Sequence, residues 1–270
     1  MQLMPHMNMP CHYSLDLAKE RMAASMARGL HPFCEFPEHD KTMIIVGNGP
    51  SLRGQLRAIR DRKARGGVIM TVQGADKFLL SKGIVPDFVA MLDGGEGMER
   101  YIQPDRRVSY LVASIVHPSV FDALEGCPVI LWHADMGRGE HDFMQETFPD
   151  KPWCMIGGGC TVGLRCINLG YLMGFRKMHI YGMDSSIDRG HYAAPAESLT
   201  GIRATEFEVV CAGKAFKVVP YLAQQAQDFA DLMRKTFSGK IDIIAHGDGL
   251  IPHICRTMRK AGECQRSKAA

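Results

Sequence analysis

The residues best suited to chemistry lie where short apolar runs end in glycine-rich turns. The first run, residues 43–46, is followed by five residues: Gly47, Asn48, Gly49, Pro50 and Ser51. Glycine lets a backbone approach a ligand closely, and a helix that begins after such a turn adds partial positive charge. Backbone N–H groups in this setting commonly bind phosphate. Because Leu52 stands where the dinucleotide fingerprint needs a third glycine, the pattern indicates a nucleotide without specifying NAD.

A second glycine-rich turn precedes a helical pattern over residues 161–173. It consists of Gly157, Gly158 and Gly159, and Thr161 follows as a suitable helix N-cap. Two such turns in one sheet predict a diphosphate or a nucleotide monophosphate held from two sides. Close packing of a helix against a sheet is the alternative reason for the glycines.

Two acidic residues follow other apolar runs. Asp93 begins the turn after residues 88–92, and Asp184 ends the turn after residues 178–181. A carboxylate beyond a strand end can bind Mg²⁺ that bridges phosphates, or act as a general base. Turn and helix-capping aspartates have the same pattern. We predict that Asp93 and Asp184 are catalytic and metal-binding residues.

Three further polar residues follow predicted strand ends. Gln73 closes the run 68–72 and offers a donor and an acceptor to a base or ribose, although it would serve equally as a loop amide. His191 and Tyr192 follow Asp184 in a polar loop that contains Gly190. This loop either closes over a ligand, with Tyr192 donating to phosphate and His191 relaying a proton, or is a mobile surface loop.

The candidate site residues must be positioned by a larger structure. Strand-like and helix-like patterns alternate from residue 42 onward and indicate what that structure is. Strands are expected at 42–46, 68–72, 88–92, 110–115, 129–132, 178–181 and 241–245, and helices at 52–64, 75–82, 161–173, 221–236 and 250–260. Strands that are apolar throughout and separated by helices indicate a parallel sheet covered on both faces. We predict an α/β fold, a Rossmann-like doubly wound and mainly parallel sheet, with ligands beyond the C-terminal strand ends.

The chain is predicted to hold one main domain with an N-terminal helical extension. A helical pattern over 14–28, with Ser14 as N-cap and Leu15, Ala18, Met22 and Met26 on one face, ends at Gly29 and is followed by a proline-containing segment. Residues 1–40 are therefore assigned to an extension and linker, 41–262 to the Rossmann-like nucleotide-binding domain, and 263–270 to a tail.

Composition narrows the class of protein. The chain has 270 residues, of which 46% are hydrophobic and 23% charged, as in ordinary globular proteins. A net charge of +3 is too small to indicate nucleic-acid binding. Nine cysteines without a C-x-x-C pair, the lack of a signal-peptide pattern and the lack of a long apolar run predict a cytoplasmic protein without a membrane partner. We expect a nucleotide and a small-molecule acceptor as partners, and the composition is compatible with an oligomer.

The order of these motifs resembles the 6-hydroxymethylpterin diphosphokinase (MptE-like) family, whose domain also forms the core of motility-associated-factor proteins linked to flagellin glycosylation. The resemblance runs over roughly residues 42–193, through the segment 46–52, the segment 82–93, the glycines 157–159, the segment 182–184 and His191. It implies a Rossmann-like fold and diphosphate transfer from ATP to a pterin alcohol with Mg²⁺. It also implies that Gly47–Ser51 and Gly157–Thr161 bind phosphates and that Asp93 and Asp184 bind metal or act as the base.

A second resemblance is to the small α/β sialyltransferases of bacteria. They share Gly-Asn-Gly-Pro-Ser-Leu after a strand, a small-residue turn before a helix, and Gly-x-Asp after a later strand, and Tyr192 falls where they have a tyrosine on the donor phosphate. That resemblance implies a CMP-type nucleotide. Their catalytic histidine has no counterpart, because no histidine occurs between His191 and His246.

Three functions follow from this sequence. The first is a nucleotide-dependent transferase of the MptE-like kind that moves diphosphate from ATP to a small hydroxylated, pterin-like acceptor with Mg²⁺. The alternative is a glycosyltransferase that uses a nucleotide sugar with a CMP-type donor. The third is a non-catalytic nucleotide-binding module that recruits a partner through residues 1–40.

Overall fold

A computed structural model describes residues 13–188 and 205–269 of the chain, with side chains described as far as residue 261. Its centre is a nine-stranded sheet in the order β1-β6-β5-β4-β3-β2-β8-β11, with β7 paired to β6. All pairings of this sheet are parallel. The strands are β1 (His31–Pro32), β2 (His39–Val46), β3 (Val68–Val72), β4 (Phe88–Met91), β5 (Ser109–Ala113), β6 (Val129–Ala134), β7 (Met155–Ile156), β8 (Phe175–Tyr181) and β11 (Asp242–Ala245).

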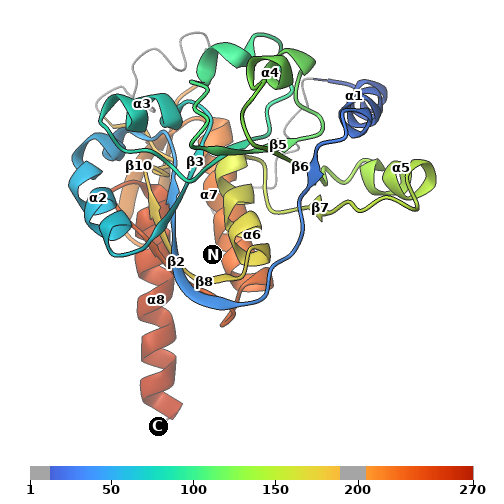
Figure 1. The fold of residues 1–270 in the computed structure, drawn as a ribbon. Helices are drawn as coiled ribbons and strands as arrows, with labels where there is room; N and C mark the ends of the chain where they lie inside the picture. Colours follow the sequence, from blue (N-terminus) through green and yellow to red (C-terminus); the bar gives the residue numbers. More distant parts are fainter. Residues whose placement is uncertain (1–12, 189–204, 270) are drawn as a thin grey trace.

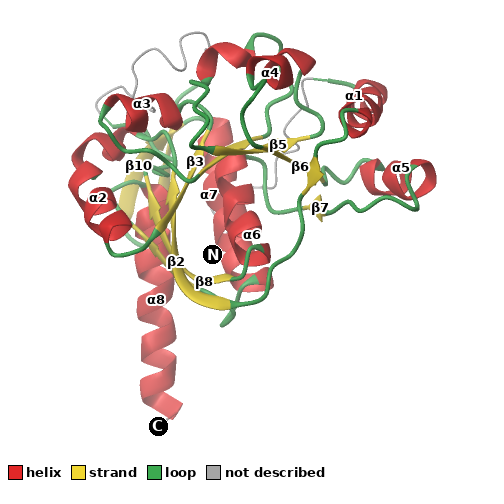
Figure 2. Cartoon of the chain, in the orientation of Figure 1, coloured by secondary structure: helices red, strands yellow, loops and turns green. Residues whose placement is uncertain are grey.

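Helices cover both faces of the sheet, as the continuous apolar strands predict. They are α1 (Leu15–Ala27), α2 (Leu56–Ala64), α3 (Ala75–Ser81), α4 (Pro118–Ala123), α5 (Glu140–Thr147), α6 (Val162–Leu172), α7 (Pro220–Asp231) and α8 (Leu250–Ala269). Figure 1 shows α2 and α3 on one side of the sheet and α6 and α7 on the other, and Figure 2 shows the strands enclosed between them. Ile44, Ile45 and Ile69 are consequently fully buried. This arrangement confirms the predicted doubly wound α/β fold.

The strand order reverses between β2 and β8. From β2 the chain runs outward through β3, β4, β5 and β6, and it returns to place β8 and β11 on the other side of β2. Val46 and Tyr181, the last residues of β2 and β8, are register partners. In open α/β sheets the ligand crevice lies beyond the C-terminal strand ends at this switch point. The turns after β2 and β8 therefore adjoin the expected binding crevice.

The structure differs from the sequence expectations mainly at short elements. The segment expected to be a linker contains β1, and β7 was not expected either, because two-residue strands leave no periodic pattern. A hairpin of β9 (Phe207–Cys211) and β10 (Lys214–Val218) was also missed. The helix expected at 52–64 begins as a 3₁₀ turn, η1 (Pro50–Gly54), before α2. The last helix continues to Ala269 and extends beyond the body of the molecule (Figure 1).

The N-terminal helix forms as expected but packs through a more polar face. Ser14 caps α1, since its Oγ accepts a hydrogen bond from Leu17 N–H at 3.1 Å. Its buried residues are Ala18, Arg21, Met22 and Ser25, whereas the expected apolar face had Leu15 and Met26. Among the described residues, no helix is long and apolar enough to cross a bilayer.

Candidate functional site

The turn after β2 is bonded mainly to the end of β8. Gly47 N–H donates to Tyr181 O at 2.8 Å, and Gly49 N–H donates to Gly182 O at 2.6 Å. Ser51 N–H donates to Asp184 Oδ2 at 2.9 Å, while Pro50 has no N–H to offer. Three of the N–H groups expected to bind phosphate are therefore already used within the protein.

The glycines of this turn are required by close packing of the two strand ends. A Cβ on Gly47 would lie 2.5 Å from Gly182 O. A Cβ on Gly49 would overlap Asp184 Oδ2 and lie 2.7 Å from Gly182 O. Substitution at Gly49 would therefore disturb the fold whether or not a ligand binds here. The side chain of Asn48 reaches toward the end of β3, where its Nδ2 lies beside Gly74.

Asp184 lies just after the end of β8, at the switch point of the sheet. Its side chain is only 3% exposed, and among the described residues its Oδ1 has no hydrogen-bond partner. Burial raises the pKa of Asp184, and hydrogen bonds from Ser51 oppose this in part. A Cβ on Gly247 would lie 3.1 Å from Oδ1, so the glycine leaves space beside that oxygen. A buried carboxylate oxygen without a donor, next to such a space, suits a cation or a hydroxyl group.

The second glycine turn, after β7, is held by side chains of α6 and α7. Asn168 Nδ2 donates to Gly157 O at 2.5 Å, and Arg165 Nε donates to Gly159 O at 3.1 Å. Gly158 and Gly159 have φ angles of 112° and 93°, which only glycine adopts without strain. Thr161 caps α6 as predicted, with its Oγ1 accepting from Leu164 N–H at 3.5 Å.

One glutamine of α7 joins this turn to the end of β8. Gln225 Nε2 donates to Thr161 Oγ1 at 2.7 Å, and Ser185 Oγ donates to Gln225 Oε1 at 2.6 Å. Ser185 has a left-handed φ of 49°, a strained conformation for a residue other than glycine that is often found at functional sites. Through Gln225 the structure thus links Ser185, the neighbour of Asp184, to the start of α6. Sequence reasoning missed Gln225 and Ser185, because neither lies in a motif.

Asp93 lies at a different part of the same edge. It is exposed, and its Oδ1 accepts a hydrogen bond from Gly95 N–H at 2.8 Å. It follows β4, and the order β4-β3-β2-β8 puts three strand spacings, roughly 14 Å, between the strands that carry Asp93 and Asp184. One ion does not bridge that gap. No group of three or more potential metal-ligating side chains occurs within the described part of the chain.

A band of polar contacts connects the ends of β3, β4 and β5. Gln73 Nε2 donates to Met98 O at 2.8 Å and so ties the end of β3 to the 3₁₀ turn η2 (Met98–Tyr101). The next residue, Glu99, accepts a hydrogen bond from Ser119 Oγ at 2.7 Å, and Ser119 Oγ also lies 2.8 Å from His117 Nδ1. That hydrogen bond from Ser119 holds the pKa of Glu99 below its usual range. Sequence reasoning did not select these three residues.

The helix α1 is bonded to the turns after β4 and β5. Arg21 donates to Gly94 O and, at 3.3 Å, to Ile115 O, so one guanidinium holds the turns after both strands. Ser25 Oγ donates to Ser114 O at 2.8 Å.

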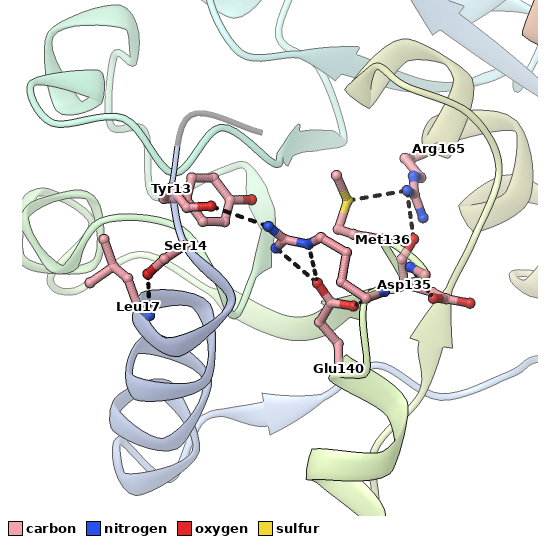
Figure 3. Close-up of polar contacts among 9 residues, drawn as sticks. Tyr13, Ser14, Leu17, Asp135, Met136, Glu140 and Arg165 are labelled. Carbon is pink, nitrogen blue, oxygen red and sulfur yellow. Dashed lines mark hydrogen bonds and ion pairs between the residues drawn. The ribbon is translucent and has the colours of Figure 1, made fainter. Parts of the chain in front are cut away.

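The segment before α1 is fixed by a second arginine. Arg138 Nη1 donates to Tyr13 O at 3.1 Å, and Arg138 pairs with the fully buried Glu140 at 2.8 Å. Figure 3 shows Tyr13 and Glu140 in this arrangement, with Arg165 nearby reaching Asp135 O and Met136 Sδ. His191 and Tyr192 lie outside the described residues.

Comparisons with known proteins concern the family and the fold of the chain. A family model described as 6-hydroxymethylpterin diphosphokinase MptE-like matches residues 20–190. The structure of a MAf glycosyltransferase from Magnetospirillum magneticum AMB-1 aligns with a TM-score of 0.60 and 17% identity, over 87% of this chain and 38% of that chain. This likeness shows a shared fold, and the chain spans well under half of that protein.

A mammalian sialyltransferase in complex with Gal-beta-1-3GalNAc-ortho-nitrophenol aligns with a TM-score of 0.44 and 10% identity, over 87% of each chain, and no argument rests on it. Curated protein sequences give no significant match. The family match, in contrast, covers residues 20–190 of 270, more than half of the chain. The chain therefore belongs to the 6-hydroxymethylpterin diphosphokinase MptE-like family.

Proposed function

We propose that this protein is a transferase that moves the diphosphate group of ATP to a hydroxyl group of a small, pterin-like acceptor. The observation that carries the proposal is the buried Asp184, whose Oδ1 lacks a partner among the described residues, at the switch point between β2 and β8. Membership of the MptE-like family supplies the reaction class.

The donor nucleotide is assigned to the half of the edge formed by β2, β8 and the start of α6. Asn48 and Ser51 follow β2, and Thr161 lies at the start of α6, where a helix N-terminus favours anions. Gln225 fixes Thr161 relative to Ser185 through hydrogen bonds of 2.7 and 2.6 Å. These contacts support a nucleotide whose phosphates lie between the turns after β2 and β7.

Mg²⁺ fits the carboxylate of Asp184, because this ion usually takes one or two carboxylates and completes its shell with phosphate oxygens and water. Asp184 would hold the ion through Oδ1, since Oδ2 accepts from Ser51 N–H at 2.9 Å. Mg²⁺ bound there would neutralise negative charge on the phosphates.

The acceptor is assigned to the half of the edge near β3 and β4. Asp93 is exposed and follows β4, where a carboxylate can orient an attacking hydroxyl group. Gln73 is half-buried and follows β3, which places an amide between the two halves. In the reaction, the acceptor oxygen attacks the β-phosphorus of ATP, and AMP leaves with the electron pair of the broken P–O bond.

Glycosyl transfer from a nucleotide sugar is the second candidate function. The segment Gly47–Leu52 favours it through its resemblance to small sialyltransferases, and a MAf glycosyltransferase shares the fold. In that reaction the CMP-type nucleotide would occupy the same crevice, and a sugar would move in place of diphosphate.

Product analysis separates the two functions. The protein is incubated with Mg²⁺ and either ATP plus 6-hydroxymethyl-7,8-dihydropterin or a CMP-sugar, and nucleotide products are separated by chromatography. Diphosphate transfer yields AMP and a pterin diphosphate. Release of CMP with no AMP from ATP would reject the first function in favour of the second, and ATP binding without turnover of any donor would indicate a non-catalytic module.

A further inference from the structure

A chain of three hydrogen-bonded side chains lies beyond the ends of β4 and β5. Ser119 Oγ donates to Glu99 Oε2 at 2.7 Å, and His117 Nδ1 lies 2.8 Å from the same Oγ. Glu99 belongs to η2, His117 immediately precedes α4, and Ser119 is in its first turn. A carboxylate, a hydroxyl and an imidazole in this order can hold and polarise the imidazole.

This chain of side chains adjoins the acceptor half of the edge. β4 and β5 are neighbours in the sheet, with Met91 and Val112 as register partners, so their ends are about 4.8 Å apart. Arg21 bonds to Gly94 O, next to Asp93, and to Ile115 O, two residues before His117. The turn with Asp93 and the turn with His117 are therefore fixed to each other, whereas Asp184 is three strands away from Asp93.

One nitrogen of His117 remains for a substrate. The imidazole is half-buried, and among the described residues its Nε2 makes no hydrogen bond. When Nε2 is unprotonated, Nδ1 carries the hydrogen and donates it to Ser119 Oγ, which donates its own to Glu99. The 3.3 Å contact from Ser119 N–H to Nδ1, which caps α4, belongs to the other tautomer. A histidine that only caps α4 would not need the hydrogen bond between Ser119 and Glu99.

We propose that His117 is the general base that takes the proton of the acceptor hydroxyl group, and that Ser119 and Glu99 position it. The inference rests on the proposed diphosphate transfer. The acceptor proton moves to Nε2 as the acceptor oxygen forms a bond to the β-phosphorus, and the bond from that phosphorus to the oxygen of the α-phosphate breaks to release AMP. Glu99, acting through Ser119, stabilises the imidazolium, which then returns the proton to solvent.

The test compares His117→Asn with the parent protein, using ATP, Mg²⁺ and 6-hydroxymethyl-7,8-dihydropterin. Asparagine is a good helix N-cap, so this variant keeps the cap of α4 and removes the base. We expect kcat for AMP formation to fall by roughly a hundredfold or more, with the ATP-induced thermal shift unchanged. The matched control is His31→Asn, at an exposed histidine of β1, which should keep the parent rate.

Chemical rescue distinguishes catalysis from packing. In His117→Ala, added imidazole should restore part of the lost rate, which a merely structural role would not allow. Ser119→Ala and Glu99→Gln should lower kcat by less than His117→Asn and leave the KM for ATP unchanged. The inference is overturned, and the proposed function is not, if His117→Asn keeps the kcat of the parent or if imidazole does not restore the rate lost in His117→Ala. If the parent protein forms no AMP, the proposed function and the inference both fail.

Discussion

Acid should destabilise this protein through a histidine buried in the sheet. His133, in β6, is 1% exposed, and its Nδ1 lies 2.8 Å from Ser114 Oγ. Burial lowers the pKa of His133 to about 4. Between about pH 6.5 and pH 4 the unfolded chain therefore binds a proton at this site that the folded protein does not. The stabilisation is fully present above pH 6.5 and is lost as the pH falls toward 4.

The magnitude follows from the size of the shift. The full difference of about 2.5 pKa units corresponds to roughly 3 kcal/mol by pH 4. At pH 5 the protonated form of this histidine in the unfolded chain outnumbers the neutral form by roughly 30 to 1. Roughly 2 kcal/mol of the free energy of unfolding is therefore already lost at that pH. Burial also lowers the pKa of His246 to about 4, with His179 and Arg62 adding to the shift, but that side chain is more exposed and contributes less.

Urea unfolding between pH 7 and pH 5 measures this effect. His133→Gln should be less stable than the parent at pH 7 but should lose roughly 2 kcal/mol less on acidification. His31→Gln, at an exposed position, should keep the slope of the parent. Burial raises the pKa of Asp76 and Asp184, and these two groups make the folded protein more stable as the pH falls. The informative quantity is therefore the difference in pH dependence between His133→Gln and the parent. Equal slopes for His133→Gln and the parent would refute the reasoning.

Three further predictions concern the residues around the switch point. In thermal unfolding, Gly158→Ala should lower the free energy of unfolding by roughly 1–3 kcal/mol, because its Cβ would overlap Asn168 Nδ2 at a φ of 112°. The control Gly54→Ala should be near neutral, because no atom lies within 4 Å of its Cβ. Gln225→Ala should weaken ATP binding measured by calorimetry, because it disconnects Thr161 from Ser185, and an unchanged affinity would remove this bridge from the site. Asp184→Asn should keep the fold and abolish any gain in ATP affinity on adding Mg²⁺, and a retained gain would assign the ion elsewhere.

The sheet and its glycine turns could be predicted from sequence because their signals are local. Strands such as Val68–Val72 are apolar throughout, and the turn Gly47–Ser51 punctuates the pattern directly after β2. The same local patterns do not reveal what the turns bind. The N–H group of Ser51 is used by Asp184, 133 positions later, which no local pattern encodes.

Polar residues that act through long-range contacts could not be predicted. Arg21 is buried in a helix whose expected face was apolar, and its bonds to Gly94 O and Ile115 O span 73 and 94 residues. Glu99 and Ser119 are 20 residues apart, and in the sequence they have the character of ordinary surface residues. Only the folded structure shows that they form a hydrogen bond. Asp93 and Asp184 occupy equivalent positions after strands in the sequence, and only the strand order shows that three strand spacings lie between them.

The central claim, that the transferred group is a diphosphate, is tested most directly with ATP that carries ³²P only at the β-phosphorus. The protein is incubated with this ATP, Mg²⁺ and 6-hydroxymethyl-7,8-dihydropterin, and the labelled products are separated. If the account is right, the label appears in the pterin product and the released AMP is unlabelled. Label retained in ADP beside an unlabelled pterin phosphate, or label that stays in ATP while the protein turns over a CMP-sugar, would contradict it.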